Sequence, residues 1–140
     1  METQYFRTIS NFFVAGINYK KSDASIRGMY AINNDQYKII LEKAGYKVAV
    51  LSNGTDILNN HYERPDLFLL DKQLPGADGL QICRYLKAHK TTNQIPVILI
   101  SASVGIGKLA MDAGANDFIE KPFDKKHLLD VIAENLNKAE

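Results

Sequence analysis

The sequence has few of the features that mark secreted, membrane-spanning or nucleic-acid-binding proteins. It contains one cysteine, Cys83, so no internal disulfide can form, and a reducing, cytoplasmic setting is expected. No apolar run approaches the roughly 20 residues of a membrane-spanning helix, and the N-terminus lacks the basic start and long apolar stretch of a secretory signal. The formal net charge is +1, without a block of either sign, so we expect contact with neither nucleic acid nor membrane.

What the chain does have is the size and composition of one compact domain. It has 140 residues, of which 46% are hydrophobic and 24% are charged. A chain of this size can bury a core without disulfides or structural metals. We therefore expect a single domain over residues 1–140, in which residues 1–40 carry the least regular pattern.

Beyond residue 44, predicted strands alternate with predicted helices. Strands are predicted at residues 46–51, 66–70, 96–100 and 116–119, and helices at residues 55–62, 79–88, 106–113 and after a cap at Asp124, with Thr55 capping the first of them. This alternation favours a parallel sheet with helices on both faces. Asp71, Ser101 and Lys121 each stand at or just past the carboxyl end of a predicted strand, where such sheets carry their functional crevice.

Three segments then resemble one known family. Residues 64–79, 95–102 and 113–123 are similar to the third, fourth and fifth strand regions of response-regulator receiver domains, in the same order and at compatible spacing. The similarity runs from about Leu41 to the C-terminus. It implies a flavodoxin-like, doubly wound α/β fold with a five-stranded parallel sheet in the order 2-1-3-4-5 and helices on both faces, and a place in a two-component phosphorelay.

The resemblance also implies roles for the residues at the strand ends. Asp71 matches the aspartate that accepts a phosphoryl group from a phosphohistidine, Ser101 the hydroxyl residue that turns toward the phosphate, and Lys121 the lysine that pairs with it. The chemistry agrees with this assignment, because positive charge must neutralise the phosphoryl oxygens while positioning supplies most of the rate.

Three further roles come from the same resemblance. Phe118 matches the aromatic switch residue that swings inward on activation. The backbone carbonyl of Gln73 matches a Mg²⁺ ligand, alongside Asp71 itself. Pro122 matches the proline after the lysine, whose peptide bond is often cis in this family.

The acidic pair that ends the first strand of the family, and helps to hold Mg²⁺, is missing. In one register residues 12–17 form that strand, Asn18 follows it, and a long helix begins at Ser22 or Asp23. In the other, residues 28–32 form the strand and Asn33 and Asn34 replace the acids. We favour the first register, because the second shortens the helix to about nine residues and leaves the apolar N-terminal stretch unexplained. Asn18 or Asn33 therefore stands at the metal position.

An asparagine at that position brings no negative charge, so Mg²⁺ should bind weakly or not at all. The leading interpretation is a receiver domain that is phosphorylated on Asp71 and signals through its surface. The alternative is a pseudo-receiver that binds partners without phosphorylation. A remote alternative is a phosphohydrolase with an aspartate nucleophile, which usually carries a second aspartate two residues later, where this chain has Gln73.

The expected partners are a histidine kinase or phosphotransfer protein and a downstream protein target, with a homodimer left open. The resemblance implies that the target binds the fourth helix, fifth strand and fifth helix. Since the chain ends at Glu140, just after the last predicted helix, output is expected through protein contacts. No enzymatic activity is expected beyond phosphorylation and dephosphorylation of Asp71 itself.

Overall fold

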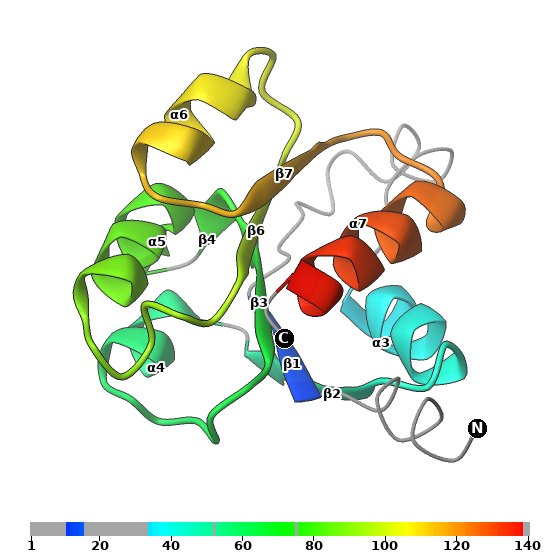
Figure 1. Cartoon of the computed structure of the whole chain (residues 1–140), viewed down its shortest axis with the longest axis horizontal. Helices are drawn as coiled ribbons and strands as arrows, with labels where there is room; N and C mark the ends of the chain where they lie inside the picture. Colours follow the sequence, from blue (N-terminus) through cyan, green and yellow to red (C-terminus); the bar gives the residue numbers. More distant parts are fainter. Residues whose placement is uncertain (1–10, 16–33, 52, 75, 139–140) are drawn as a thin grey trace.

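The computed structural model describes residues 11–15, 34–51, 53–74 and 76–138. At its centre lies a sheet of five parallel strands in the order β2-β1-β3-β6-β7 (Figure 1). The strands are β1 (Asn11–Ala15), β2 (Lys47–Leu51), β3 (Leu67–Asp71), β6 (Val97–Ser101) and β7 (Asp117–Glu120). This order confirms the predicted doubly wound fold.

Helices cover both faces of the sheet (Figure 1). One face carries α3 (Asn34–Lys43) and α7 (Lys125–Lys138), and the other carries α4 (Gly54–Leu58), α5 (Gly79–Ala88) and α6 (Ile106–Asp112). Among these described helices, none has the length and apolar character to cross a membrane.

The continuous apolar run of β3 supplies both halves of the core. Leu67 and Leu69 pack with the residues of α3 and α7, whereas Phe68 and Leu70 pack with those of α4, α5 and α6. All four side chains have no exposed surface. Successive side chains of a strand point to opposite faces, so an unbroken apolar run is what a strand covered on both sides requires.

Strand β1 lies in the segment where the favoured register placed the first strand. Residues Asn11–Ala15 pair in parallel with β2, and Phe12–Ala15 pair in parallel with β3, so the strand overlaps residues 12–17 of the favoured register. Residues 28–32 of the other register lie outside the described residues. Asn18 and Asn33, and the predicted helix start at Ser22 or Asp23, lie outside the described residues.

Two local predictions were wrong. The helix at residues 55–62 is capped by Asn53, whose side chain accepts a hydrogen bond from Thr55 N at 2.9 Å, and the helix ends at Leu58 rather than residue 62. The segment from Lys72 to Asp78, predicted as a plain loop, contains a short antiparallel pair, β4 (Gln73–Leu74) with β5 (Ala77–Asp78). Asp124 does cap the last helix, because its Oδ1 accepts from His127 N at 2.7 Å.

Helix α5 begins in close contact with the end of β3. Gly79 N donates a hydrogen bond to Lys72 O at 2.8 Å. A Cβ at Gly79 would collide with the carbonyl oxygen of Asp71 and lie 2.8 Å from Lys72 Cα. Only a residue without a side chain lets the helix start this near to Asp71.

We expect Gly79→Ala to destabilise the protein by about 1–3 kcal/mol, because the added methyl must push backbone atoms apart. Urea denaturation measures the loss. The control Gln81→Ala, at an exposed position of the same helix, should change the free energy of unfolding by less than about 0.5 kcal/mol. Equal stability of the Gly79→Ala and wild-type proteins would show that the backbone around Gly79 can shift to accept a methyl group without cost.

Candidate functional site

Asp71, Ser101 and Lys121 meet at one edge of the sheet. Asp71 ends β3, Ser101 ends the neighbouring β6, and Lys121 directly follows β7, the next strand along. The strands are parallel, so their carboxyl ends share an edge. The three residues predicted from strand ends are therefore brought together.

The Asp71 carboxylate is buried and has a partner for each oxygen. Its side chain belongs to a residue that is 4% exposed. Lys121 Nζ lies 2.6 Å from Oδ2, and Gln73 N donates to Oδ1 at 2.9 Å. A buried charge is tolerable only when it is paired and hydrogen-bonded, and this one is both.

Ser101 is also buried and its hydroxyl is held from one side. Ser103 N donates to Ser101 Oγ at 3.0 Å, which fixes the oxygen at the end of β6. A hydroxyl accepts and donates at once. This bond therefore leaves the hydroxyl proton for an acceptor at the same edge.

Phe118 lies partly buried on β7, with its ring against α6. A Cβ at Gly107 would be 2.8 Å from the ring atom Cζ, so the ring rests directly over this glycine. The ring also joins the core beneath α5 and α6. Phe118, the predicted switch residue, therefore packs its ring against α6 at Gly107, where the helix has no side chain.

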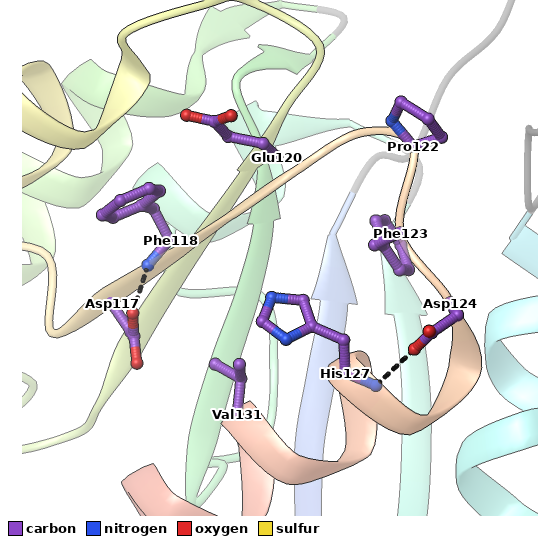
Figure 2. A pocket seen from close by; sticks show the side chains of 8 residues that line it. All are labelled: Asp117, Phe118, Glu120, Pro122, Phe123, Asp124, His127 and Val131. Carbon is purple, nitrogen blue, oxygen red and sulfur yellow. Dashed lines mark hydrogen bonds between the residues drawn. The ribbon is translucent and has the colours of Figure 1, made fainter.

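An open cleft of about 670 Å³ lies along β7, the following loop and the start of α7 (Figure 2). Its walls include three acidic residues, Asp117, Glu120 and Asp124, together with His127. The peptide bond between Lys121 and Pro122, in the loop beside it, is cis.

Tyr37 is a site neighbour that the sequence did not single out. Its ring centroid lies 5.9 Å from that of Phe123, two residues after Lys121. Burial, and to a smaller degree the charge of Asp71, raises the pKa of this tyrosine well above its ordinary value. In the sequence Tyr37 falls on one apolar helical stripe with Ile40, Leu41 and Ala44. That pattern does not show that its side chain packs against the loop after Lys121.

The described residues do not by themselves fit a Mg²⁺ ion. Among them, no group of three or more His, Cys, Asp or Glu side chains could hold a metal. Mg²⁺ demands an octahedron of oxygen ligands, whereas Asp71 already gives both its oxygens to Lys121 and Gln73. The metal-ligand roles predicted for Asp71, the Gln73 carbonyl and Asn18 or Asn33 stay predictions.

Comparisons with a family model, related sequences and solved structures all find receiver domains or response regulators. A family model for the response regulator receiver domain matches residues 31–133. The DNA-binding response regulator MtrA of Mycobacterium tuberculosis (strain ATCC 25618 / H37Rv) is 36% identical over 103 residues, which are 71% of this chain and 44% of MtrA. The chain thus spans less than half the length of this relative. Strand β1 precedes the residues that the family model matches.

Two solved receiver domains have the same fold. That of sensor histidine kinase PA1611 from Pseudomonas aeruginosa PAO1, which has a magnesium ion in its active-site cleft, gives a TM-score of 0.72 at 21% identity and covers 92% of this chain and 98% of that one. The BeF3-activated receiver domain of DrrB gives a TM-score of 0.67 at 26% identity, with coverage of 92% and 98%.

We expect Lys121→Met to destabilise the protein by about 1–3 kcal/mol, because the buried Asp71 carboxylate loses its cation. Lys126→Met is a matched control, since Lys126 is also 2.6 Å from a carboxylate, that of Asp130, but both side chains are exposed. It should change stability little. Adding Asp71→Asn to Lys121→Met should restore most of the loss, and additive effects in this double-mutant cycle would contradict the coupling.

Gly107→Ala should displace the Phe118 ring, because the new methyl and the ring cannot both occupy their places. We expect a net loss of stability by chemical denaturation and a changed aromatic NMR signal of Phe118. In a Phe118→Ala background the conflict disappears, so the same change should stabilise the protein by up to about 1 kcal/mol through helix propensity. The same sign in both backgrounds would mean that the ring is not seated on Gly107.

Proposed function

Since the chain belongs to the response-regulator receiver domain family, we propose that it accepts a phosphoryl group on Asp71 from a histidine kinase or phosphotransfer protein and passes the signal through its surface. The observation that carries this proposal is the buried Asp71 carboxylate, paired with Lys121 at 2.6 Å at the carboxyl edge of the sheet. We also propose that the described residues form one receiver domain.

The proposed reaction needs little from the protein beyond position and charge. An Asp71 carboxylate oxygen attacks the phosphorus atom, the bond from phosphorus to the donor nitrogen breaks, and the imidazole leaves with the electron pair. The Lys121 ammonium lies beside the oxygens as negative charge builds up on them. The bond from Gln73 N fixes the carboxylate while this happens.

The signal would travel from Asp71 through Ser101 and Phe118. A phosphoryl group adds oxygen acceptors at the strand ends, and the Ser101 proton can turn toward them. The Phe118 ring would then leave its place on Gly107 and move toward the hydroxyl of Ser101.

The movement of the ring would change the surface of α6, β7 and α7, where we place the contact with a downstream protein target or a second copy of the chain. The acidic lining of the cleft along β7 favours a partner that presents basic residues.

Two of the other expectations stay predictions for this chain. It is not expected to turn over a substrate, and its net charge of +1 gives no reason to expect contact with nucleic acid. MtrA is a DNA-binding response regulator, but this chain spans only 44% of that protein.

A pseudo-receiver that binds partners without phosphorylation is the second candidate. It is favoured by one observation, that the described residues hold no cluster of acidic metal ligands. In this case Asp71 and Lys121 would act as a structural ion pair, and the surface would stay in one state. Among the described residues, no observation supports phosphohydrolase activity.

Labelling with acetyl phosphate separates the two candidates. We expect intact-protein mass spectrometry to show one added phosphoryl group on the wild-type chain and none on Asp71→Asn, which keeps the shape of the side chain. The label should form slowly and depend only weakly on Mg²⁺ concentration, because an uncharged asparagine stands where the family carries its acidic pair.

Circular dichroism should show that both proteins are folded. Labelling of Asp71→Asn would place the reaction elsewhere in the chain. A folded wild-type protein that stays unlabelled at any Mg²⁺ concentration would reject phosphorylation and favour the pseudo-receiver.

A further inference from the structure

The hydroxyl of Tyr37 is a buried polar group without a hydrogen-bond partner among the described residues. The Tyr37 side chain has no exposed surface, and in the part of the chain that the structure describes its oxygen has no hydrogen-bond partner. Native proteins rarely bury a hydroxyl in this way, because it loses its hydrogen bonds to water without replacement. The exception calls for a physical reason.

Its surroundings place the hydroxyl beside the Asp71 site. Tyr37 packs on the sheet face that α3 and α7 cover, against Phe123 in the loop that follows Lys121. Asp71 follows Leu67 and Leu69 in the alternation of side chains along β3, so its side chain points to this same face of the sheet. Burial and, to a smaller degree, the charge of Asp71 raise the pKa of Tyr37. No hydrogen bond joins the Tyr37 hydroxyl to the Asp71 carboxylate.

The two carboxylate oxygens already have donors, Lys121 and Gln73. A phosphoryl group on Asp71 would bring three further acceptor oxygens into the space around the carboxylate. The raised pKa keeps the tyrosine protonated, so it is a hydrogen-bond donor throughout the physiological pH range.

We propose that Tyr37 is a binding residue for the phosphoryl group, and that its hydroxyl donates a hydrogen bond to an oxygen atom which phosphorylation adds at Asp71. This inference rests on the proposed function. It assigns the unpaired hydroxyl a partner that is present only in the phosphorylated protein. Before phosphorylation the hydroxyl is an unfavourable buried group, and afterwards it is satisfied.

The test uses beryllofluoride as the phosphoryl probe, with Mg²⁺ present, and follows the melting temperature as the probe is titrated. Binding to the folded state raises the melting temperature in proportion to affinity and concentration. We expect Tyr37→Phe to bind the probe about tenfold more weakly than wild type, as loss of one hydrogen bond to a charged group implies. Without the probe, Tyr37→Phe should melt at the same or a higher temperature, because it removes only an unpaired hydroxyl.

Tyr85→Phe is the matched control. It also removes one tyrosine hydroxyl, but that hydroxyl donates to Leu58 O at 3.2 Å on the opposite face of the sheet. It should lower the melting temperature slightly and leave the affinity for beryllofluoride unchanged. Asp71→Asn should abolish binding.

The outcomes separate this inference from the proposed function. If wild type and Tyr37→Phe bind the probe equally, Tyr37 is no phosphoryl ligand, while the role of Asp71 stands. If the wild-type protein neither binds the probe nor is labelled by acetyl phosphate, the role of Asp71 is wrong and the role of Tyr37 is wrong with it. A Tyr37→Phe protein that melts well below wild type without the probe would show that the hydroxyl already has a partner.

Discussion

A carboxylate that is 4% exposed must find its compensation within the fold, and this requirement at Asp71 constrains much of the structure. One oxygen is satisfied locally by Gln73 N, but the other depends on Lys121, which is 50 residues away in sequence. The lysine reaches it only because β6 and β7 run parallel to β3 and end at the same edge. Strand order and strand direction are thus conditions for a tolerable charge, and the same geometry sets a cation beside the carboxylate that we propose as the nucleophile.

Two glycines bring the helices close enough to act on this edge. At Gly79 the start of α5 contacts the backbone of Asp71 and Lys72, and at Gly107 the face of α6 contacts the ring of Phe118. In both places a side chain would separate a helix from the residue whose position matters. The first contact holds the backbone of Asp71 against the start of α5. The second holds the Phe118 ring against α6, so we expect a small change at Gly107 to act directly on the ring.

The sequence predicted the fold well where a residue pattern is compatible with only one kind of structure. An unbroken apolar run such as that of β3 can be covered only from both sides, and the strand-end rule alone brought Asp71, Ser101 and Lys121 together. It failed where two neighbours can do the same task, since Asn53 and Thr55 are both good caps, and where elements are too short to show a period, as in β4 and β5. The hydroxyl of Tyr37 could not be found in this way, because the lack of a hydrogen-bond partner is a property of the packed structure and leaves the helical pattern unchanged.

The charge balance at the edge explains why neutral donors matter here. Among the described residues the site pairs one carboxylate with one ammonium, Asp71 with Lys121, and no acidic cluster stands ready to hold a cation. A phosphoryl group would add about −1.5 to −2 charges, which Lys121 alone does not offset. A site rich in carboxylates meets this need with a divalent cation, whereas asparagine at position 18 or 33 weakens that option. In the proposed mechanism, the buried hydroxyls of Ser101 and Tyr37 then donate hydrogen bonds to the phosphoryl oxygens. Such donors stabilise the phosphoryl group without adding charge and without a bound metal ion.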